Sequence, residues 1–480
     1  MAGFFCTHAT YWFSMLSYAA MRSTDENNER EKGWKTSGVL RIPVSKMKHF
    51  IFSIKKQPPG RLIVMGFALV ILLGTALLLL PVSVKDGATV TFIDALFTST
   101  SAVCVTGLIA IDVADHFTAF GQTVVAALIQ IGGLGVTSIG VGLILAARKR
   151  VGIKGRVLVK EAFNVDGIKG MVRLVRSVLL MTLCFEVVGM LLSFLVFSQD
   201  YSPLHALGIS AFHSIAAFNN SGFDILGGLR NLTIYPDNLL LNLTTCGLII
   251  FGGLGFLVIL DVLKKRSFKK LTLHSKVVIT TTIVLLVGGT LLLKATEDIT
   301  WLGAFFQSVS ARTAGFSTYN IGEFTNAGLF TLIVLMFIGA SPGSTGGGIK
   351  TSTFFVLMQQ VRGIFTKKHV GAFKRSISND VLAKASMIAL VSLLLVCGGT
   401  FLLCVLEPDC TFIQLLFEQV SAFGTVGLST GITPGLCDGS KLVLIFTMFA
   451  GRVGMFTLLS IWIERPAPTT HYTEEAITVG

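Results

Sequence analysis

The sequence predicts an all-α polytopic membrane protein, and three observations support this fold class. The 480 residues are 52% apolar and only 14% charged, whereas an ordinary soluble domain has about 25% charged residues. Apolar runs close to the length that crosses a bilayer recur along the chain. Glycine-containing segments accompany these runs at regular intervals, which indicates an internal repeat.

The apolar runs define eight candidate membrane spans. The first run, from Leu62 to Pro81, has 20 residues, or about 30 Å of helix. A shorter semi-apolar segment ending in glycine lies between the members of each successive pair, and we interpret it as re-entrant. The spans are 61–81, 121–147, 177–197, 238–261, 277–293, 328–360, 383–406 and 441–463. The re-entrant segments are 92–107, 206–222, 301–315 and 411–427.

The basic residues gather on one predicted side of the membrane. Of 39 Lys and Arg, 10 lie in 22–61, nine in 148–176 and six in each of 264–276 and 362–384. By the positive-inside rule, these segments and both termini are cytoplasmic. The opposite loops contain 14 acidic residues, so the predicted outer mouth attracts cations. Their five basic residues are Lys85, Arg230, Lys294, Arg312 and Lys441. Membrane insertion and lipid headgroups explain the net charge of +13 without a nucleic-acid partner.

Four glycines align at the ends of the re-entrant segments. They are separated by 115, 93 and 112 residues, and each is followed by Leu or Phe. Each precedes, by 24 to 30 residues, a second glycine cluster in the next span. Close helix packing is an alternative reason for such glycines, but four copies in register favour one repeated unit. The aligned glycines are Gly107, Gly222, Gly315 and Gly427, and the clusters lie at 132–135, 252–255, 339–348 and 451–454.

The repeated unit has a specific physical consequence. A short helix that ends mid-membrane points its negative C-terminal end at the membrane centre. The extended backbone after it is tolerated at that depth only beside water or within protein. Four such stretches around one axis would form rings of carbonyl oxygens, which can replace the hydration shell of a cation. Glycine permits the backbone conformations that aim neighbouring carbonyls at the axis.

The chain resembles the Trk/Ktr/HKT superfamily of potassium transporters over about 58–466. The resemblance rests on the four loops, on the order of span, pore loop and span, and on the segment Gly339-Ala-Ser-Pro-Gly-Ser-Thr-Gly-Gly-Gly-Ile-Lys-Thr351. Ktr-type bacterial pore subunits are the most similar, because the N-terminal segment leaves little room for the additional spans of Trk-type subunits. The resemblance implies a selectivity filter that binds K⁺ through backbone carbonyls. Sodium-preferring members carry serine at the first filter glycine, whereas this chain keeps Gly107, which favours potassium. The implied filter residues are Val105, Thr106, Gly107, Asn220, Ser221, Gly222, Thr313, Ala314, Gly315, Thr425, Val426 and Gly427.

A glycine-rich break interrupts the span 328–360. Residues 339–348 contain Pro342 and seven glycines or serines, so the helix should break there. We interpret the break as a gate below the filter, in agreement with the resemblance. A phosphate-binding loop is the alternative, but Ile349 separates the last glycine from Lys350 and no strand leads in. The predicted gate residues are Gly343, Gly346, Gly347, Gly348, Lys350 and Arg452.

Arg452 places a permanent charge inside the last span, where charge is costly and faces a cavity or a partner. It aligns with the glycine-rich break, so it could hydrogen-bond loop carbonyls and oppose passing cations. A snorkelling or helix-pairing arginine is the alternative. Glu186 is the only acid well inside a span, and its role stays open.

The resemblance implies potassium uptake across the cell (inner) membrane by a channel-like, ion-conducting subunit with four pseudo-repeats around one central pathway. It further implies a homodimer and a separate cytoplasmic nucleotide-binding regulatory subunit (KtrA-like), with loops 148–176 and 362–384 as expected docking surface. Membrane lipids are the other expected partners, and K⁺ is transported rather than held as a cofactor. An enzyme is not expected, since the spans lack clustered His, Asp or Glu. The alternative is a secondary cation transporter, sodium-coupled or Na⁺-conducting, that works by alternating access.

The repeats also divide the chain into predicted regions. A cleaved signal peptide is not expected, because no basic region precedes the apolar residues 4–20. A disulfide between Cys410 and Cys437 stays open, because both would flank the same outer loop. The predicted regions are a partly disordered cytoplasmic segment 1–57, repeats 58–150, 151–266, 267–368 and 369–466, and a tail 467–480.

Overall fold

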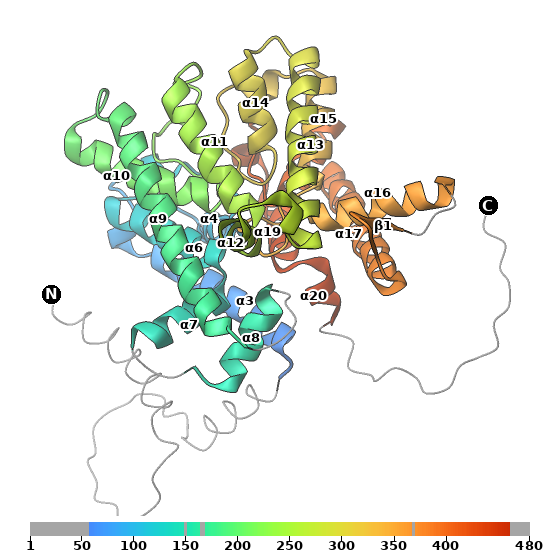
Figure 1. The fold of residues 1–480 in the computed structure, drawn as a ribbon. Helices are drawn as coiled ribbons and strands as arrows, with labels where there is room; N and C mark the ends of the chain where they lie inside the picture. Colours follow the sequence, from blue (N-terminus) through green and yellow to red (C-terminus); the bar gives the residue numbers. More distant parts are fainter. Residues whose placement is uncertain (1–56, 148–150, 164–168, 367–369, 461–480) are drawn as a thin grey trace, which may run out of the picture. The chain divides into compact units, whose positions relative to one another are not determined.

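The computed structural model describes residues 57–147, 151–163, 169–366 and 370–460, and these are predominantly helical (Figure 1). The predictions for 1–56 and for the tail 467–480 lie outside the described residues. Within the described ranges, the only strands are β1 (Gly371–Ala372) and β2 (Arg375–Ser376). They form an antiparallel hairpin with Ala372 opposite Arg375.

Four long helices correspond to the first span of each predicted repeat. Each is apolar and long enough to cross a membrane, yet only 28% to 39% of the residues in its most apolar window are buried. Apolar side chains therefore cover the outward sides of these helices, as lipid contact requires. These helices are α3 (Pro59–Leu78), α9 (Met171–Phe197), α13 (Leu273–Thr296) and α17 (Asn379–Leu406).

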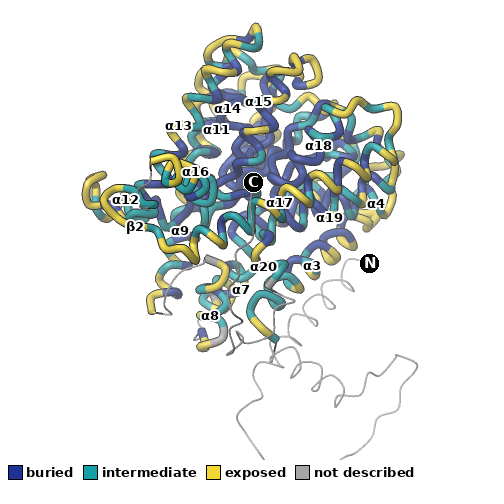
Figure 2. The backbone as a smooth tube through the Cα atoms, turned by 90° about the vertical axis from the view of Figure 1, so that its right-hand side faces the viewer, coloured by how far each residue is buried: buried dark blue, intermediate teal, exposed yellow. Residues whose placement is uncertain are grey.

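Four shorter helices correspond to the re-entrant segments, and their C-terminal halves are buried. Three begin with a threonine cap, which supplies an acceptor for orphan backbone N–H groups: Thr91 accepts from Asp94 and Thr300 from Gly303, and Thr411 forms a capping box with Gln414. Figure 2 shows buried backbone gathered in the interior, with exposed segments at the periphery. These helices are α4 (Phe92–Cys104), α10 (Pro203–Phe218), α14 (Trp301–Ser310) and α18 (Phe412–Gly424).

The second helix of every repeat is broken, whereas the sequence predicts a break in the third repeat alone. The first and second pairs bend by 98° and 96° at their breaks. Gly135, Gly255 and Gly454 sit at the breaks with φ of 82°, 90° and 88°, a region that favours glycine. The prediction of continuous spans over 121–147, 238–261 and 441–463 is therefore wrong for their described parts. The helix pairs are α6 (Ala119–Leu134) with α7 (Val136–Ala146), α11 (Leu239–Leu254) with α12 (Phe256–Lys265), α15 (Asn326–Phe337) with α16 (Thr351–Thr366), and α19 (Asp438–Val453) with α20 (Met455–Ser460).

The breaks change the count of membrane-crossing helices. In the described part of the chain, four helices qualify on their own, or up to six if each of the two bent pairs counts as one span. The eight-span count stays a prediction. The connecting elements are η1 (Pro81–Ser83), α5 (Val113–His116), α8 (Ile153–Phe163), η2 (Phe268–Lys270), η3 (Ile321–Glu323) and η4 (Thr433–Gly435).

A packing motif recurs between the long and short helices. Gly74 of α3 lies so close to Ser99 of α4 that an added Cβ would overlap its hydroxyl. That hydroxyl donates to the carbonyl of Ile71 at 2.7 Å. The second and third repeats reproduce both contacts, and in the fourth the Gln419 amide takes the place of the serine against Gly399. The corresponding pairs are Gly189 with Ser214 and Gly289 with Ser308.

A buried ion pair joins the first and last repeats. Lys441 in the first turn of α19 donates to Asp94 of α4 at 2.9 Å, and each side chain is 10% exposed. Removing one partner of such a pair leaves an uncompensated charge, at a cost of about 3–5 kcal/mol. The pair therefore ties together two helices whose paired residues are 347 positions apart in the chain.

Candidate ion pathway

The four loops that follow the short helices share one unusual backbone conformation. The aligned glycines have φ of 88°, 69°, 79° and 94° in chain order. The residue two positions earlier also has positive φ in every loop: 57° at Val105, 58° at Asn220, 72° at Thr313 and 49° at Thr425. Such values are uncommon outside glycine and are costly for β-branched residues. Their recurrence at one position shows that the packing around all four loops imposes the same shape.

The aligned glycines place the loops around a common centre. A Cβ added to Gly107 would overlap the carbonyl oxygen of Ser221 in the second loop. Gly222 faces the carbonyl of Ala314 in the same way, Gly315 that of Val426, and Gly427 that of Thr106. The contacts run from each loop to the next and back to the first, so they close a ring in chain order.

The ring brings together all twelve residues predicted for the filter. Each non-glycine member is fully buried. The ring carbonyls with these contacts belong to the residue just before each glycine, so the loops contribute equivalent oxygens.

Serine hydroxyls brace three of the loops, a feature that the sequence reading missed. Ser101 accepts from the backbone N–H of Gly107 at 3.0 Å and donates to the carbonyl of Leu108 at 2.8 Å. Ser421 accepts from the N–H of Gly427 at 3.1 Å, and Ser310 donates to the carbonyl of Phe316. The signal was available, because a serine lies six residues before the aligned glycine in the first and fourth loops and five before it in the third, whereas the second loop has Ala216 and Ala217 at these places.

A hollow of about 400 Å³ lies over one side of the ring and is lined by Gly107, Gly315 and Gly427 together with loop residues such as Asn231. Carboxylates stand close to the loops around it. Asp112 accepts from the backbone N–H of Leu229 at 2.7 Å, and Asp115 from that of Gly228 at 3.0 Å. We call this hollow the mouth cavity.

Asp224 is a buried carboxylate in the loop that follows Gly222. Burial raises the pKa of Asp224 to about 7, and the negative charges of Asp112 and Asp115 add to the rise. A hydrogen bond from the Leu226 backbone N–H, at 3.0 Å, and the charge of Arg230 oppose it. The folded protein therefore holds this proton to a higher pH than the unfolded chain does.

We expect Asp224 to make stability fall as pH rises from about 4 to about 7. Its unfolded pKa is near 3.9, so the stabilisation from the bound proton is complete below about pH 4 and is lost as pH rises through the folded value. The loss is on the order of 1.4 kcal/mol per pH unit in that window. Thermal unfolding in detergent at pH 5 and pH 8 measures it, and Asp224→Asn should flatten the difference. The exposed Asp86→Asn serves as control; equal pH effects in wild type and Asp224→Asn would contradict the assignment.

The predicted break at 339–348 is present and lies directly against the ring. The backbone N–H of Gly347 donates to the Thr425 hydroxyl at 2.9 Å. A Cβ added to Gly346 would overlap the hydroxyl of Thr313. The Asn220 amide lies 3.3 Å from the hydroxyls of both Thr313 and Thr345. The break therefore touches three of the four loops through their positive-φ residues, and no side chain larger than hydrogen fits at 346 or 347.

Lys350 holds the same segment from its far end. Its Nζ donates to the carbonyls of Gly346 at 2.6 Å and Gly347 at 3.3 Å. Ile338 and Ile349 form an isolated parallel bridge across the base of the loop, and Gly339 is pressed against the Gly347 carbonyl. Gly343 and Gly348 have φ of 69° and 67°. The segment is thus a closed, hydrogen-bonded loop, which we call the gate loop after the role predicted for it from the sequence.

Arg452 bridges the gate loop and the broken helix of the first repeat. Its guanidinium donates to the carbonyl of Thr345, the kind of bond expected from the sequence. It also donates to the carbonyls of Gly132 and, at 3.3 Å, Gly133 at the C-terminal end of α6. That second partner was not foreseen. It is favourable because a cation complements the negative end of a helix.

Glu186 belongs to a polar cluster behind the second loop. Its carboxylate accepts from the Asn219 amide at 3.2 Å, and the same amide donates to Gln130 at 2.7 Å. Asn219 directly precedes the loop residue Asn220, so the cluster supports the loop from behind. The other residues left open, Cys410 and Cys437, are free thiols in the structure.

The fold and this site define a polytopic α-helical membrane protein in which four backbone loops converge on one centre. The chain belongs to the TrkH family of cation transport proteins, whose family model matches residues 59–469. The predicted resemblance to the Trk/Ktr/HKT superfamily is confirmed. Members of this family are transporters, so the chain is not an enzyme.

Relatives match nearly the whole chain. Potassium/sodium uptake protein NtpJ of Enterococcus hirae is 38% identical over 444 residues, which cover 89% of this chain and 98% of that protein. Ktr system potassium uptake protein B of Bacillus subtilis is 37% identical, over 88% of this chain and 97% of its own length. The crystal structure of the potassium transporter TrkH from Vibrio parahaemolyticus has the same fold, with a TM-score of 0.67, 19% identity and 84% coverage of each chain.

Proposed function

We propose that the chain is the ion-conducting subunit of a Ktr-type potassium uptake system. The observation that carries this proposal is the closed ring of loops, in which each repeat contributes an equivalent carbonyl beside a positive-φ glycine. Such oxygens replace the hydration shell of a cation without any charged side chain. Similarity to Ktr system potassium uptake protein B supports potassium as the ion.

The gate loop supplies the control point of this pathway. It lies against Thr313 and Thr425 at one side of the ring, whereas the mouth cavity lies on the side of the glycines. In this proposal the four repeats cross the membrane eight times, each second span passing through a break. The mouth cavity faces outward and both termini are cytoplasmic, as the distribution of basic residues favours.

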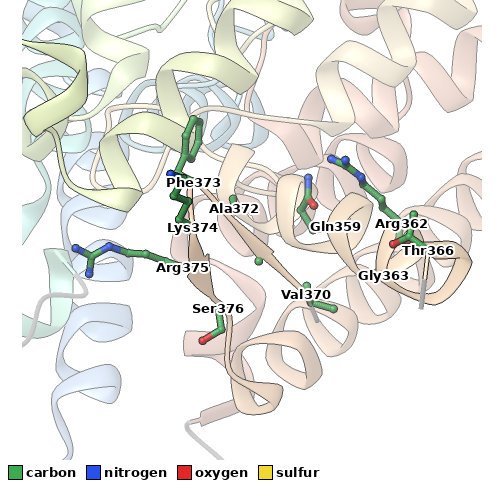
Figure 3. A pocket seen from close by; sticks show the side chains of 11 residues that line it. Gln359, Arg362, Gly363, Thr366, Val370, Ala372, Phe373, Lys374, Arg375 and Ser376 are labelled. Atoms are coloured by element: carbon green, nitrogen blue, oxygen red, sulfur yellow. The ribbon is translucent and has the colours of Figure 1, made fainter. Parts of the chain in front are cut away.

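The system includes two further partners in this proposal, a second copy of the chain and a cytoplasmic nucleotide-binding regulatory subunit. A cavity of about 450 Å³ between α16 and the β1–β2 hairpin is lined mainly by residues of the basic segment 362–384 (Figure 3). Arg362 on α16 and Arg375 on the hairpin lie on opposite sides of this cavity, so the basic groups are spread over a broad surface. A broad basic surface suits docking of a protein subunit.

Sodium is the second candidate ion. The name of the Enterococcus hirae relative includes sodium as well as potassium. In that reading the chain is a sodium-coupled or Na⁺-conducting transporter that works by alternating access. The four loops enter from the same side, which disfavours inverted-repeat rocking.

Potassium uptake by a potassium-transport-deficient bacterium tests the proposal. We expect growth at limiting potassium when the chain is expressed with a Ktr regulatory subunit, and weaker or unregulated uptake without it. Measurement of ⁸⁶Rb⁺ uptake at increasing sodium concentrations separates the two candidate functions. A potassium-selective pore keeps the same rate of ⁸⁶Rb⁺ uptake as the sodium concentration rises. Failure to restore uptake in either condition, with the protein present in the membrane, would contradict the proposal.

A further inference from the structure

Arg312 is a buried charge that the pathway described above does not use. It follows α14, immediately before the ring residue Thr313, and is 6% exposed. Its Nη2 donates to the carbonyl of Gly339 at 3.2 Å, whereas Nε and Nη1 have no hydrogen-bond partner. Among the described residues, no carboxylate forms an ion pair with Arg312, unlike Lys265 with Asp261 and Lys441 with Asp94.

The bond to Gly339 places Arg312 at a functional junction. Gly339 follows Ile338, the C-cap residue of α15, and is the first residue of the gate loop. A guanidinium there complements the negative C-terminal end of α15, as Arg452 does at the end of α6. The two arginines therefore hold the gate loop at two points, Arg312 at its first residue and Arg452 at Thr345.

Arg312 also lines a small cavity. Its volume is about 20 Å³, and it lies where α11, α13 and α14 meet, behind the third ring loop. Thr282 of α13 also lines it, is 8% exposed, and has a hydroxyl without a partner. A space of this size holds one water molecule, and water occupies such spaces when polar groups can bind it. The remaining lining is mainly apolar: Ile249, Ile250, Gly253, Leu286 and Val309.

We propose that Arg312 is a positioning residue that couples the gate loop to the third ring loop, and that one ordered water between Arg312 and Thr282 completes this joint. Displacement of Gly339 when the gate loop moves is transmitted through the guanidinium to the backbone of Thr313. Thr282 and the water anchor the other edge of the guanidinium to the membrane-crossing helix α13. The proposal rests on the proposed function, since it concerns how gate and filter act together.

The test uses Arg312→Gln, Arg312→Lys and Thr282→Val in the full-length protein with its regulatory subunit. We expect Arg312→Gln to lower the potassium/sodium uptake ratio several-fold and to raise uptake without the regulatory subunit. Arg312→Lys keeps the charge but loses the planar fork of donors, so it should fall between Gln and wild type. Thr282→Val should shift both readouts in the same direction but less. Arg266→Gln, which changes an exposed arginine, is the matched control.

Several outcomes separate this inference from the proposed function. If wild type transports no potassium, the proposed function fails. If wild type transports potassium and Arg312→Gln, present at normal amounts in the membrane, keeps both the ratio and the regulation, the coupling role is wrong. If Arg312→Gln does not insert, the Lys and Thr282→Val variants decide the question. An experimental map must also show a water within about 2.7–3.2 Å of the guanidinium and the Thr282 hydroxyl; an empty or apolar-filled site would overturn that part.

Discussion

Gly107→Ser should lower the potassium/sodium uptake ratio by on the order of tenfold or more, which corresponds to about 1.4 kcal/mol of discrimination. The added Cβ would overlap the Ser221 carbonyl, one of the oxygens that form the ring. Either that carbonyl turns away or the first loop shifts, and both changes disturb the equivalent oxygens of two adjacent repeats. The φ of 88° at this position adds strain for any residue with a side chain. Competition between ⁸⁶Rb⁺ and Na⁺ in cells that express equal amounts of protein measures the ratio.

Gly87→Ser is the matched control, because Gly87 has a similar φ of 82° but open space around it. It reports the cost of the backbone conformation alone, without contact with a carbonyl. We expect its uptake ratio to equal that of wild type. A Gly107→Ser protein with an unchanged ratio and normal membrane insertion would show that the ring does not select the ion.

Arg452→Ala should raise potassium flux per inserted molecule and weaken its regulation. Its guanidinium donates to the gate loop at Thr345 and to the end of α6 at Gly132 and Gly133. Loss of the side chain therefore removes the link between the gate loop and α6 of the first repeat. Hydrogen bonds from a charged donor contribute roughly 1.5–3 kcal/mol each. A unit charge 4 Å from a passing cation adds a barrier of about 4 kcal/mol at an effective dielectric constant near 20. Both contributions favour the closed state.

Two further substitutions distinguish the contributions of charge and hydrogen bonding. Arg452→Lys keeps the charge but loses the planar fork that reaches three carbonyls, so its flux should lie between wild type and alanine. Lys350→Met removes a charge from the same loop without touching α6, because the bonds of Lys350 within the described residues go to Gly346 and Gly347. It should raise flux less than Arg452→Ala. A normalised flux at or below wild type in Arg452→Ala would mean that the arginine serves helix packing.

The sequence predicted the parts of the site that repeat. Glycine in register after four short apolar segments indicated the loops around Gly107, Gly222, Gly315 and Gly427, and the structure brings these loops together. The pattern is readable because only glycine fits both the positive φ and the contact with the next carbonyl. Pro342 with its neighbouring glycines likewise marked the gate loop, since that composition opposes a helix at any depth.

The sequence reading failed where one residue type has two structural uses. Gly135, Gly255 and Gly454 each end a helix, yet isolated glycines in apolar runs also serve helix packing, so the bends were not predicted. Arg312 was assigned to an outer loop by counting charges along segments, and that count carries no information about burial. The structure buries it against Gly339. Long-range partners such as Gly132 for Arg452 depend on how repeats pack, which no local pattern encodes.

The ring closes within a single chain, and this has a genetic consequence. When four identical subunits form one pore, a single mutant subunit can inactivate the whole tetramer. Activity then falls as the fourth power of the fraction of wild-type subunits. Here one polypeptide supplies all four quadrants through Thr106, Ser221, Ala314 and Val426. In the proposed function each conducting unit is therefore either entirely wild type or entirely mutant, and activity should decline in simple proportion to allele dosage. The same arrangement lets each repeat change in sequence independently of the other three. The third repeat carries the gate loop in this way, and the other three repeats lack it.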